Sequence, residues 1–145
     1  MIQKTEDCIE YWVSKLGRAM NNISDKELQK YDLTLSQSAV LYQLWAEDGL
    51  TQKEIQERLN LRAASVSGLV DTLLMKKFIY REQDNKDCRC KRLYLTEDAK
   101  HIYSQIIKIR NEMEDLTCKG FLEYEKSILI SSLQKAYSNL KNEIQ

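Results

Sequence analysis

The clearest pattern of apolar and polar positions lies in the middle of the chain. Thr51 and Glu54 have the spacing of a capping box, which predicts that a helix begins there. Ile55 and Leu59 give this helix one apolar face. After a short interruption, a second helical series follows, with small or polar residues on its first turns, at Val66, Leu69, Val70, Leu73 and Leu74. Two helices joined by a short turn are therefore predicted over residues 51–76, which is the layout of a helix-turn-helix.

Two short segments with strand character follow the second helix. Residues 78–82 and 90–95 are predicted strands, and the polar residues 83–89 between them predict a loop. Together they predict a β-wing over residues 78–96, which makes the helix-turn-helix a winged helix. A third, very short strand is expected near Leu50, just before the first helix.

Long apolar stripes with helical spacing occupy both ends of the chain. They extend over residues 1–23, 97–119 and 121–144. A chain of 145 residues offers no further layer to cover these stripes, so we expect the ends to pack together and against a second copy. Residues 1–30 and 100–145 are thus the expected dimerisation arms.

The segment between these arms, residues 32–98, is the expected winged-helix lobe. Its first helix is predicted over residues 32–48 and begins with a second capping box at Thr34 and Gln37. The chain has no Pro, four Gly and 30% charged residues, a composition typical of a mainly helical protein. We therefore predict one domain of the mainly α class with a small β-wing.

Hydropathy predicts a cytoplasmic protein. No apolar run approaches the length needed to span a bilayer, and the N-terminus lacks the pattern of a signal peptide. No contact with membranes is expected.

Charge is unevenly distributed along the chain. The net charge is zero, but residues 51–92 contain ten Lys and Arg against six Asp and Glu, or +4. The remainder contains twelve basic and sixteen acidic residues, or −4. A positive lobe is where contacts with nucleic-acid phosphates belong. The alternative is that charge varies by this amount along any chain.

The central segment resembles a known family. The order of elements, the stretch LTQKEIQERLNLRAASVSGLVDTLL and the Asp87-Cys88-Arg89 wing followed by LYLTEDA resemble the MarR family of bacterial transcriptional regulators. The resemblance covers nearly the whole chain. Two positions depart from the family pattern, which usually has arginine at Cys88 and glycine at Lys77.

The resemblance implies a sequence-specific regulator that binds double-stranded DNA. Such a protein binds a palindromic operator as a homodimer, most often as a repressor, and a small aromatic or phenolic ligand often releases it. It needs no cofactor and is not an enzyme. The sequence agrees with the last point, because it contains no phosphate-binding glycine loop and no nucleophile motif.

A recognition helix over residues 63–77 is expected to enter the major groove. Arg62, at its start, suits either guanine recognition or a phosphate clamp. Arg89 is expected in the minor groove, with the Asp87 carboxylate holding its guanidinium group; the alternative is a surface ion pair. The candidate DNA-contacting residues are Thr51, Gln52, Arg62, Ala63, Ala64, Ser65, Ser67, Gly68, Thr72, Lys86, Asp87, Arg89 and Lys91.

Two kinds of switch are candidates. Aromatic residues that would border the junction of arms and lobe form a possible effector pocket, namely Tyr11, Trp12, Tyr31, Tyr42 and Trp45. Their alternative role is ordinary core packing. The redox candidates are Cys8, Cys88, Cys90 and Cys118. In some peroxide-sensing members of the family, cysteines in broadly similar regions form a disulfide across the dimer, although Cys8 does not align cleanly with the sensing position.

Metal binding is not expected. His101 is the single histidine, and the four cysteines lack the paired CxxC spacing of a structural zinc site. A function of another class also stays open: a helical module that uses its winged helix only to bind protein. Salt-sensitive binding to duplex DNA would separate this alternative from a regulator.

Overall fold

The computed structural model describes residues 5–144, so residues 1–4 of the expected N-terminal arm and residue 145 lie outside the described part. The chain divides into two compact units, and the boundary in the sequence lies between Asn111 and Glu112. The described residues form helices and one small sheet, which confirms the predicted fold class. The helices are η1 Thr5–Asp7, α1 Ile9–Leu28, η2 Gln29–Tyr31, α2 Leu35–Ala46, α3 Gln52–Leu59, α4 Ala63–Met75, α5 Glu97–His101, α6 Tyr103–Thr117 and α7 Glu123–Ile144. The strands are β1 Leu50–Thr51, β2 Ile79–Gln83 and β3 Lys91–Leu95.

Both predicted capping boxes are present. At the start of α3, the Thr51 hydroxyl accepts from the Glu54 amide at 3.2 Å, and the Glu54 carboxylate accepts from the Thr51 amide at 2.7 Å. Thr34 and Gln37 make the same reciprocal pair at the start of α2. These bonds satisfy backbone donors that a helix start would otherwise leave unpaired. The sequence therefore located two helix starts to the residue.

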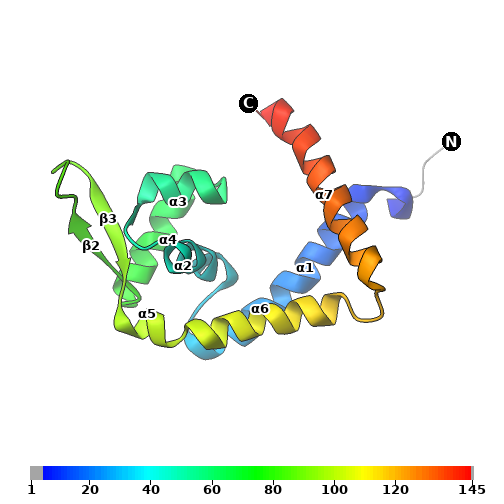
Figure 1. Ribbon diagram of the computed structural model, residues 1–145, viewed down its shortest axis with the longest axis horizontal. Helices are drawn as coiled ribbons and strands as arrows, with labels where there is room; N and C mark the ends of the chain where they lie inside the picture. Colours follow the sequence, from blue (N-terminus) through cyan, green and yellow to red (C-terminus); the bar gives the residue numbers. More distant parts are fainter. Residues whose placement is uncertain (1–4, 145) are drawn as a thin grey trace. The chain divides into compact units, whose positions relative to one another are not determined.

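The winged helix contains the core of the first unit. Figure 1 shows α2, α3 and α4 gathered beside the sheet. Their apolar faces supply fully buried side chains, which include Leu41 of α2, Ile55 of α3 and Val70 of α4. Burial of such side chains is the main favourable contribution to the stability of a domain this small. The core thus fixes α4, the predicted recognition helix, against the other two helices.

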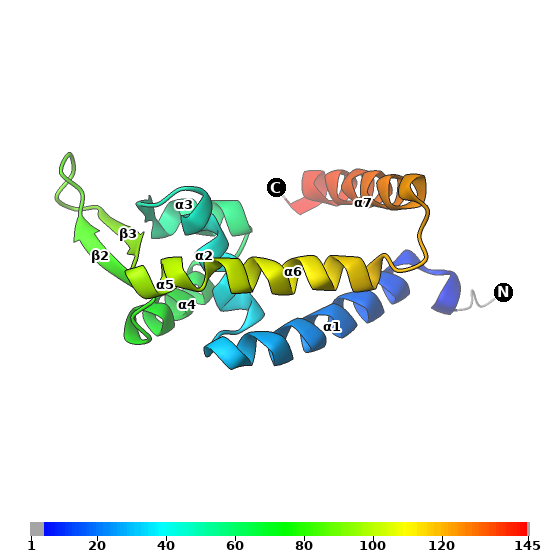
Figure 2. The same cartoon turned by 60° about the horizontal axis from the view of Figure 1, so that its bottom comes forward.

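The sheet has the order β1-β3-β2 and is antiparallel throughout. β1 confirms the expected third strand, since Leu50 pairs with Leu93 and Thr51 with Arg92. Both strands of the hairpin begin one residue later than predicted, at Ile79 and Lys91. Figures 1 and 2 show the β2–β3 hairpin extending beyond the neighbouring helices as a wing.

The recognition helix ends in a left-handed residue. Lys77 has a φ of 60°, its amide donates to the Leu74 carbonyl at 3.1 Å, and the Phe78 amide donates to the Leu73 carbonyl at 3.0 Å. This pair of bonds is a Schellman motif, which usually has glycine at the left-handed position. Lys77 therefore adopts the conformation for which the family uses glycine, and the helix end keeps its shape.

The outer helices differ from the predicted boundaries. α1 begins at Ile9 and continues to Leu28, past the predicted end of the stripe at Ile23. The single helix expected over residues 97–119 is two helices, because α5 ends at His101 and Ile102 separates it from α6. Ile102 remains in the right-handed helical region, with φ −85° and ψ −2°. The apolar residues before and after the break thus keep the spacing of one continuous helix. For this reason the apolar pattern of the sequence did not reveal the break.

Candidate nucleic-acid interface

The start of α4 presents free backbone donors. Arg62 is the N-cap, has extended backbone angles and makes no capping hydrogen bond with its side chain. Ala63, Ala64 and Ser65 form the exposed first turn. Ser65 is therefore inside the helix and does not cap it. A helix start with no side-chain acceptor carries partial positive charge and open N–H groups, both of which suit a phosphate.

The exposed face of α4 continues through small residues. Gly68 is exposed, and a Cβ added there would meet nothing within 4 Å. Ser67 is half-buried, and the Thr72 hydroxyl donates to the Gly68 carbonyl at 2.9 Å. No packing contact within the protein therefore requires glycine at this position of the helix.

Thr51 and Gln52 lie at the start of α3. The Thr51 hydroxyl both accepts from the Glu54 amide and donates to its carboxylate at 2.9 Å, so this hydroxyl is committed to the cap. Gln52 is the first residue of α3 and is half-buried. Of these two residues predicted to contact DNA, Gln52 is therefore the better candidate, because the Thr51 hydroxyl already bonds to Glu54.

The wing loop is a tight turn with Arg89 on its exposed surface. The Asp87 carboxylate accepts from the Arg89 backbone amide at 2.9 Å, and the Asp87 carbonyl accepts from the Cys90 amide at 2.9 Å. Our expectation that Asp87 holds the guanidinium group was wrong. At a separation of two residues, the backbone amide is the nearer donor, and this bond is typical of an Asx-turn. Asp87 thus shapes the turn that presents Arg89.

The structure divides the basic residues of the positive lobe into two groups. Four of them form ion pairs within the protein: Arg58 with Glu47, Lys76 with Asp32, Arg81 with Asp71, and Arg92 with Asp84. The other six are exposed and have no ion-pair partner among residues 5–144, namely Lys53, Arg62, Lys77, Lys86, Arg89 and Lys91. Lys53 and Lys77 were counted in the charge of the lobe but not among the candidate DNA contacts, and they add exposed cations to α3 and to the end of α4.

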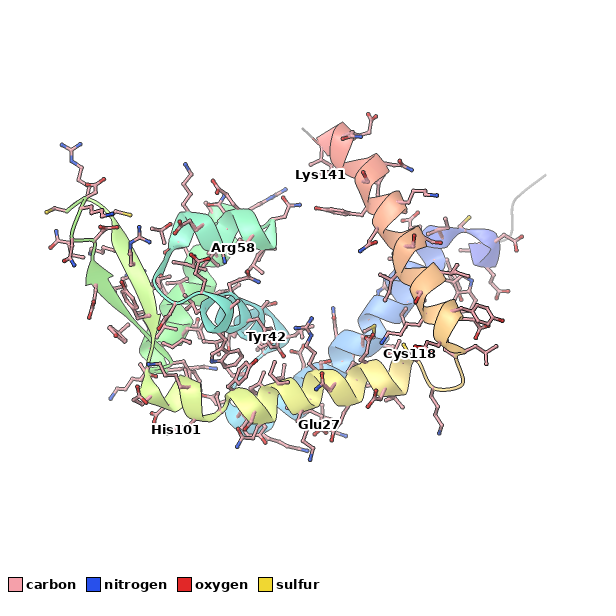
Figure 3. All side chains as sticks on the ribbon, viewed as in Figure 1. Glu27, Tyr42, Arg58, His101, Cys118 and Lys141 are labelled. Atoms are coloured by element: carbon pink, nitrogen blue, oxygen red, sulfur yellow. The ribbon has the colours of Figure 1, made fainter. Side chains whose placement is uncertain are left out.

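Two of the five candidate effector aromatics belong to one cluster. Tyr42, labelled in Figure 3, and Trp45 both lie on α2 with ring centroids 5.5 Å apart, and Trp45 also contacts Tyr103 at 5.1 Å. Burial raises the pKa of the Tyr42 hydroxyl, which donates to the Ile106 carbonyl at 3.3 Å. A hollow of about 320 Å³ lies beside this cluster, lined by Leu44, Trp45, Asp48, Leu95, Lys100 and Tyr103.

The other candidate aromatics lie elsewhere in the first unit. Tyr11 and Trp12 on α1 contact each other edge to face at 5.2 Å, and Tyr11 lines a separate hollow of about 650 Å³ at the start of α1. Tyr31 is partly buried against the core. The five residues therefore do not form one pocket, and Tyr103, which the sequence reasoning overlooked, joins the α2 cluster.

All four cysteines are free thiols. Cys88 is exposed on the wing, whereas Cys8, Cys90 and Cys118 are half-buried. Within residues 5–144, no group of three or more His, Cys, Asp or Glu side chains is arranged to hold a metal ion. In the same part of the chain, no helix is long and apolar enough to cross a membrane.

Comparison with known proteins places this geometry in a family. The family model for the MarR family matches residues 33–91, which include α2, α3, α4 and the wing as far as the first residue of β3. The HTH-type transcriptional regulator YybA of Bacillus subtilis is 23% identical over 131 residues, covering 90% of this chain and 87% of that protein. The HTH-type transcriptional regulator SarZ of Staphylococcus aureus is 30% identical over 115 residues, covering 77% of this chain and 74% of that protein.

Among solved structures, the S. aureus MepR–DNA complex matches with a TM-score of 0.86 and 30% identity, covering 94% of this chain and 99% of that one. That structure is a complex of the protein with DNA, and its fold is similar to that of this chain. The chain therefore belongs to the MarR family and is a DNA-binding transcriptional regulator.

Proposed function

We propose that this regulator represses transcription by binding a palindromic operator as a homodimer. The unpaired cations carry the proposal, because they lie on α3, at the two ends of α4, and on the wing. α4 enters the major groove, with Arg62 and the uncapped first turn against phosphates or base edges. Arg89 enters the adjacent minor groove from the wing.

The outer helices support a dimer. α7 extends over 22 residues and has no buried residue, yet it carries Ile128, Leu129, Leu133 and Tyr137. α1 also exposes apolar side chains, and Trp12 is 54% exposed. Faces this apolar are typical of an interface with another chain. We assign residues 1–30 and 100–145 to the dimerisation arms and residues 32–98 to the DNA-binding lobe.

The symmetry of the dimer gives the first test. Two recognition helices must reach successive major grooves about 34 Å apart, so the operator should be an inverted repeat with half-site centres about 10 base pairs apart. Selection of bound duplexes from a random pool, at rising salt and under reducing conditions, should recover such a repeat. Binding without any enriched motif would contradict sequence-specific regulation.

Repression needs a second test. Transcription in vitro from a promoter that contains the selected operator should fall as the protein is added. A rise in transcript would identify an activator.

Release by a small aromatic ligand would follow from a change in the spacing of the two recognition helices. The hollow beside Trp45 and Tyr103 supports this proposal, since an aromatic ring fits against indole and phenol faces. Phenolic compounds should change the fluorescence of Trp45 and weaken operator binding. The chain has two tryptophans, Trp12 and Trp45, so a Trp45→Phe variant shows which of them gives the fluorescence change. Unchanged operator affinity with all compounds would remove this proposal.

Thiol oxidation is the alternative switch. Cys88 is exposed and directly precedes Arg89, so an oxidised sulfur would add bulk and charge at the DNA contact. Peroxide should weaken operator binding by the native protein and leave a Cys88→Ser variant unaffected. Equal responses of the two proteins would exclude Cys88 as the sensor.

A further inference from the structure

Arg92 connects the wing to the helix-turn-helix. Its Nε donates to the Asp84 carboxylate at 2.5 Å, and its NH1 donates to the Gly49 carbonyl at 2.8 Å. The same NH1 lies 3.8 Å from the Glu54 carboxylate. Asp84 begins the wing loop, Gly49 precedes β1, and Glu54 lies on the first turn of α3. A single guanidinium group therefore bonds to the wing loop and to the residue before β1, and it also lies close to the start of α3.

Asp84, the partner of Arg92 in the wing loop, is itself held in place. The Asp84 carboxylate also accepts from the Lys86 amide at 2.7 Å, and the Asp84 amide donates to the Cys90 carbonyl at 2.9 Å, which closes the base of the loop. The Asp84 side chain is only 11% exposed. The Lys86 amide and Arg92 together lower the pKa of Asp84, so the carboxylate is charged under ordinary conditions.

The position of Arg92 in the sheet explains why its side chain can contact both the wing loop and the start of α3. On the central strand β3, it pairs with Thr51 of β1 on one side and Glu82 of β2 on the other. Arg92 is thus level with the start of α3 and with the last residues of β2, from which the loop carrying Arg89 departs. A change in this contact would alter the angle of the loop without removing the hairpin.

We propose that Arg92 is a positioning residue, which holds the wing at the angle where Arg89 reaches the minor groove while α4 occupies the major groove. Arg92 acts through Arg89 and does not itself touch DNA. Its guanidinium group already bonds to a carboxylate and a carbonyl, and its side chain is 36% exposed, whereas Arg89 is exposed and has no ion-pair partner among the described residues. The inference rests on the proposed minor-groove role of Arg89.

A double-mutant cycle on the selected operator tests this inference. In the native background, Arg92→Gln should weaken binding about tenfold, whereas in an Arg89→Ala background the same change should cost less than about twofold. The salt dependence of binding should decrease by about one phosphate contact in either single variant and no further in the double variant. If Arg92 contacts a phosphate directly, the two losses will multiply and each variant will remove its own contact.

Asp84→Asn provides a variant that leaves Arg92 in place. If Arg92 positions the wing, loss of its carboxylate partner should weaken DNA binding in the same way as Arg92→Gln, and again little in the Arg89→Ala background. A direct phosphate contact would predict unchanged or tighter binding, because Asp84→Asn frees the guanidinium group. This variant also decides the question if Arg92→Gln does not fold.

Arg58→Gln is the matched control. Arg58, labelled in Figure 3, lies on α3 and has a 37% exposed side chain. It also has an ion-pair partner, but this partner is Glu47 rather than a residue of the wing. The effect of Arg58→Gln on binding should therefore combine multiplicatively with the effect of Arg89→Ala.

If the native protein fails to bind any duplex, the proposed function fails. If Arg89→Ala weakens binding but Arg92→Gln does not, only the positioning role of Arg92 fails.

Discussion

At the scale of single residues, the structure distinguishes cations that hold the protein together from cations that face solvent. Arg81 is paired with Asp71 at 3.3 Å, whereas Arg89 has an Asp nearby in sequence that bonds only to its backbone amide. The sequence could not separate these cases. Asp87 was correctly linked to Arg89, but the choice between side chain and backbone depends on how the turn folds. Contacts distant in sequence, such as Arg92 to Gly49, left no pattern at all.

Arg89→Ala should weaken operator binding strongly, because an unpaired cation is lost from the wing. The slope of log binding constant against log salt concentration should decrease by about the contribution of one phosphate contact. Binding should be measured by fluorescence anisotropy over a salt series, and the oligomeric state by analytical ultracentrifugation. Lys119→Ala, an exposed cation outside the lobe, is the control. Native affinity in Arg89→Ala at moderate salt would contradict the minor-groove role.

Gly68→Ala should make the protein more stable and a weaker DNA binder. Alanine inside a helix is favoured over glycine by about 1 kcal/mol, and no atom of the protein stands in the way of the methyl group. The methyl group would instead meet the DNA surface. Thermal unfolding and operator affinity should therefore change in opposite directions. If affinity is unchanged, close approach at this position is not part of binding.

At the scale of elements, local chemistry was sufficient to locate helix starts, and tertiary contacts decided the rest. The capping boxes at Thr51 and Thr34 involve residues three apart, so the sequence shows them directly. The break at Ile102 was hidden because it preserves helical phase. The sequence also did not show that the five candidate aromatic residues lie in different places or that Tyr103 joins the cluster on α2. Tyr103 contacts Trp45 only because α6 packs beside α2 in the folded protein.

The start of α3 should weaken in acid. Hydrogen bonds from the Thr51 amide and hydroxyl hold the pKa of Glu54 below its ordinary value. A depressed carboxyl pKa contributes stability that is present above the unfolded-state pKa and lost as the pH falls through the folded-state pKa. Solvent screens this partly exposed side chain, so the effect is modest. Urea midpoints measured from pH 7 to pH 3 should fall less steeply in Glu54→Gln than in the native protein. Parallel curves for the two proteins would assign the acid sensitivity to other carboxylates.

At the scale of the whole molecule, the proposed dimer depends on the exposed apolar side chains of the outer helices. Leu133→Glu places a charge on the apolar face of α7 and should yield a monomer that loses most operator affinity, because one lobe cannot bind both half-sites. Ser131→Glu, on the same helix and roughly opposite Leu133 on the helical wheel, should stay dimeric. Light scattering and anisotropy measure the two effects. A Leu133→Glu variant that remains dimeric would exclude α7 from the interface.

The left-handed turn at Lys77 has a consequence for how such regulators diverge. A lysine there accepts about 1 kcal/mol of backbone strain that glycine would avoid. In return, the chain gains an exposed charge at the end of α4 that glycine cannot carry. The left-handed conformation is thus compatible with lysine as well as with the glycine that is usual at this position. A lineage can therefore alter its electrostatic pattern at a turn while every helix and strand stays where it was.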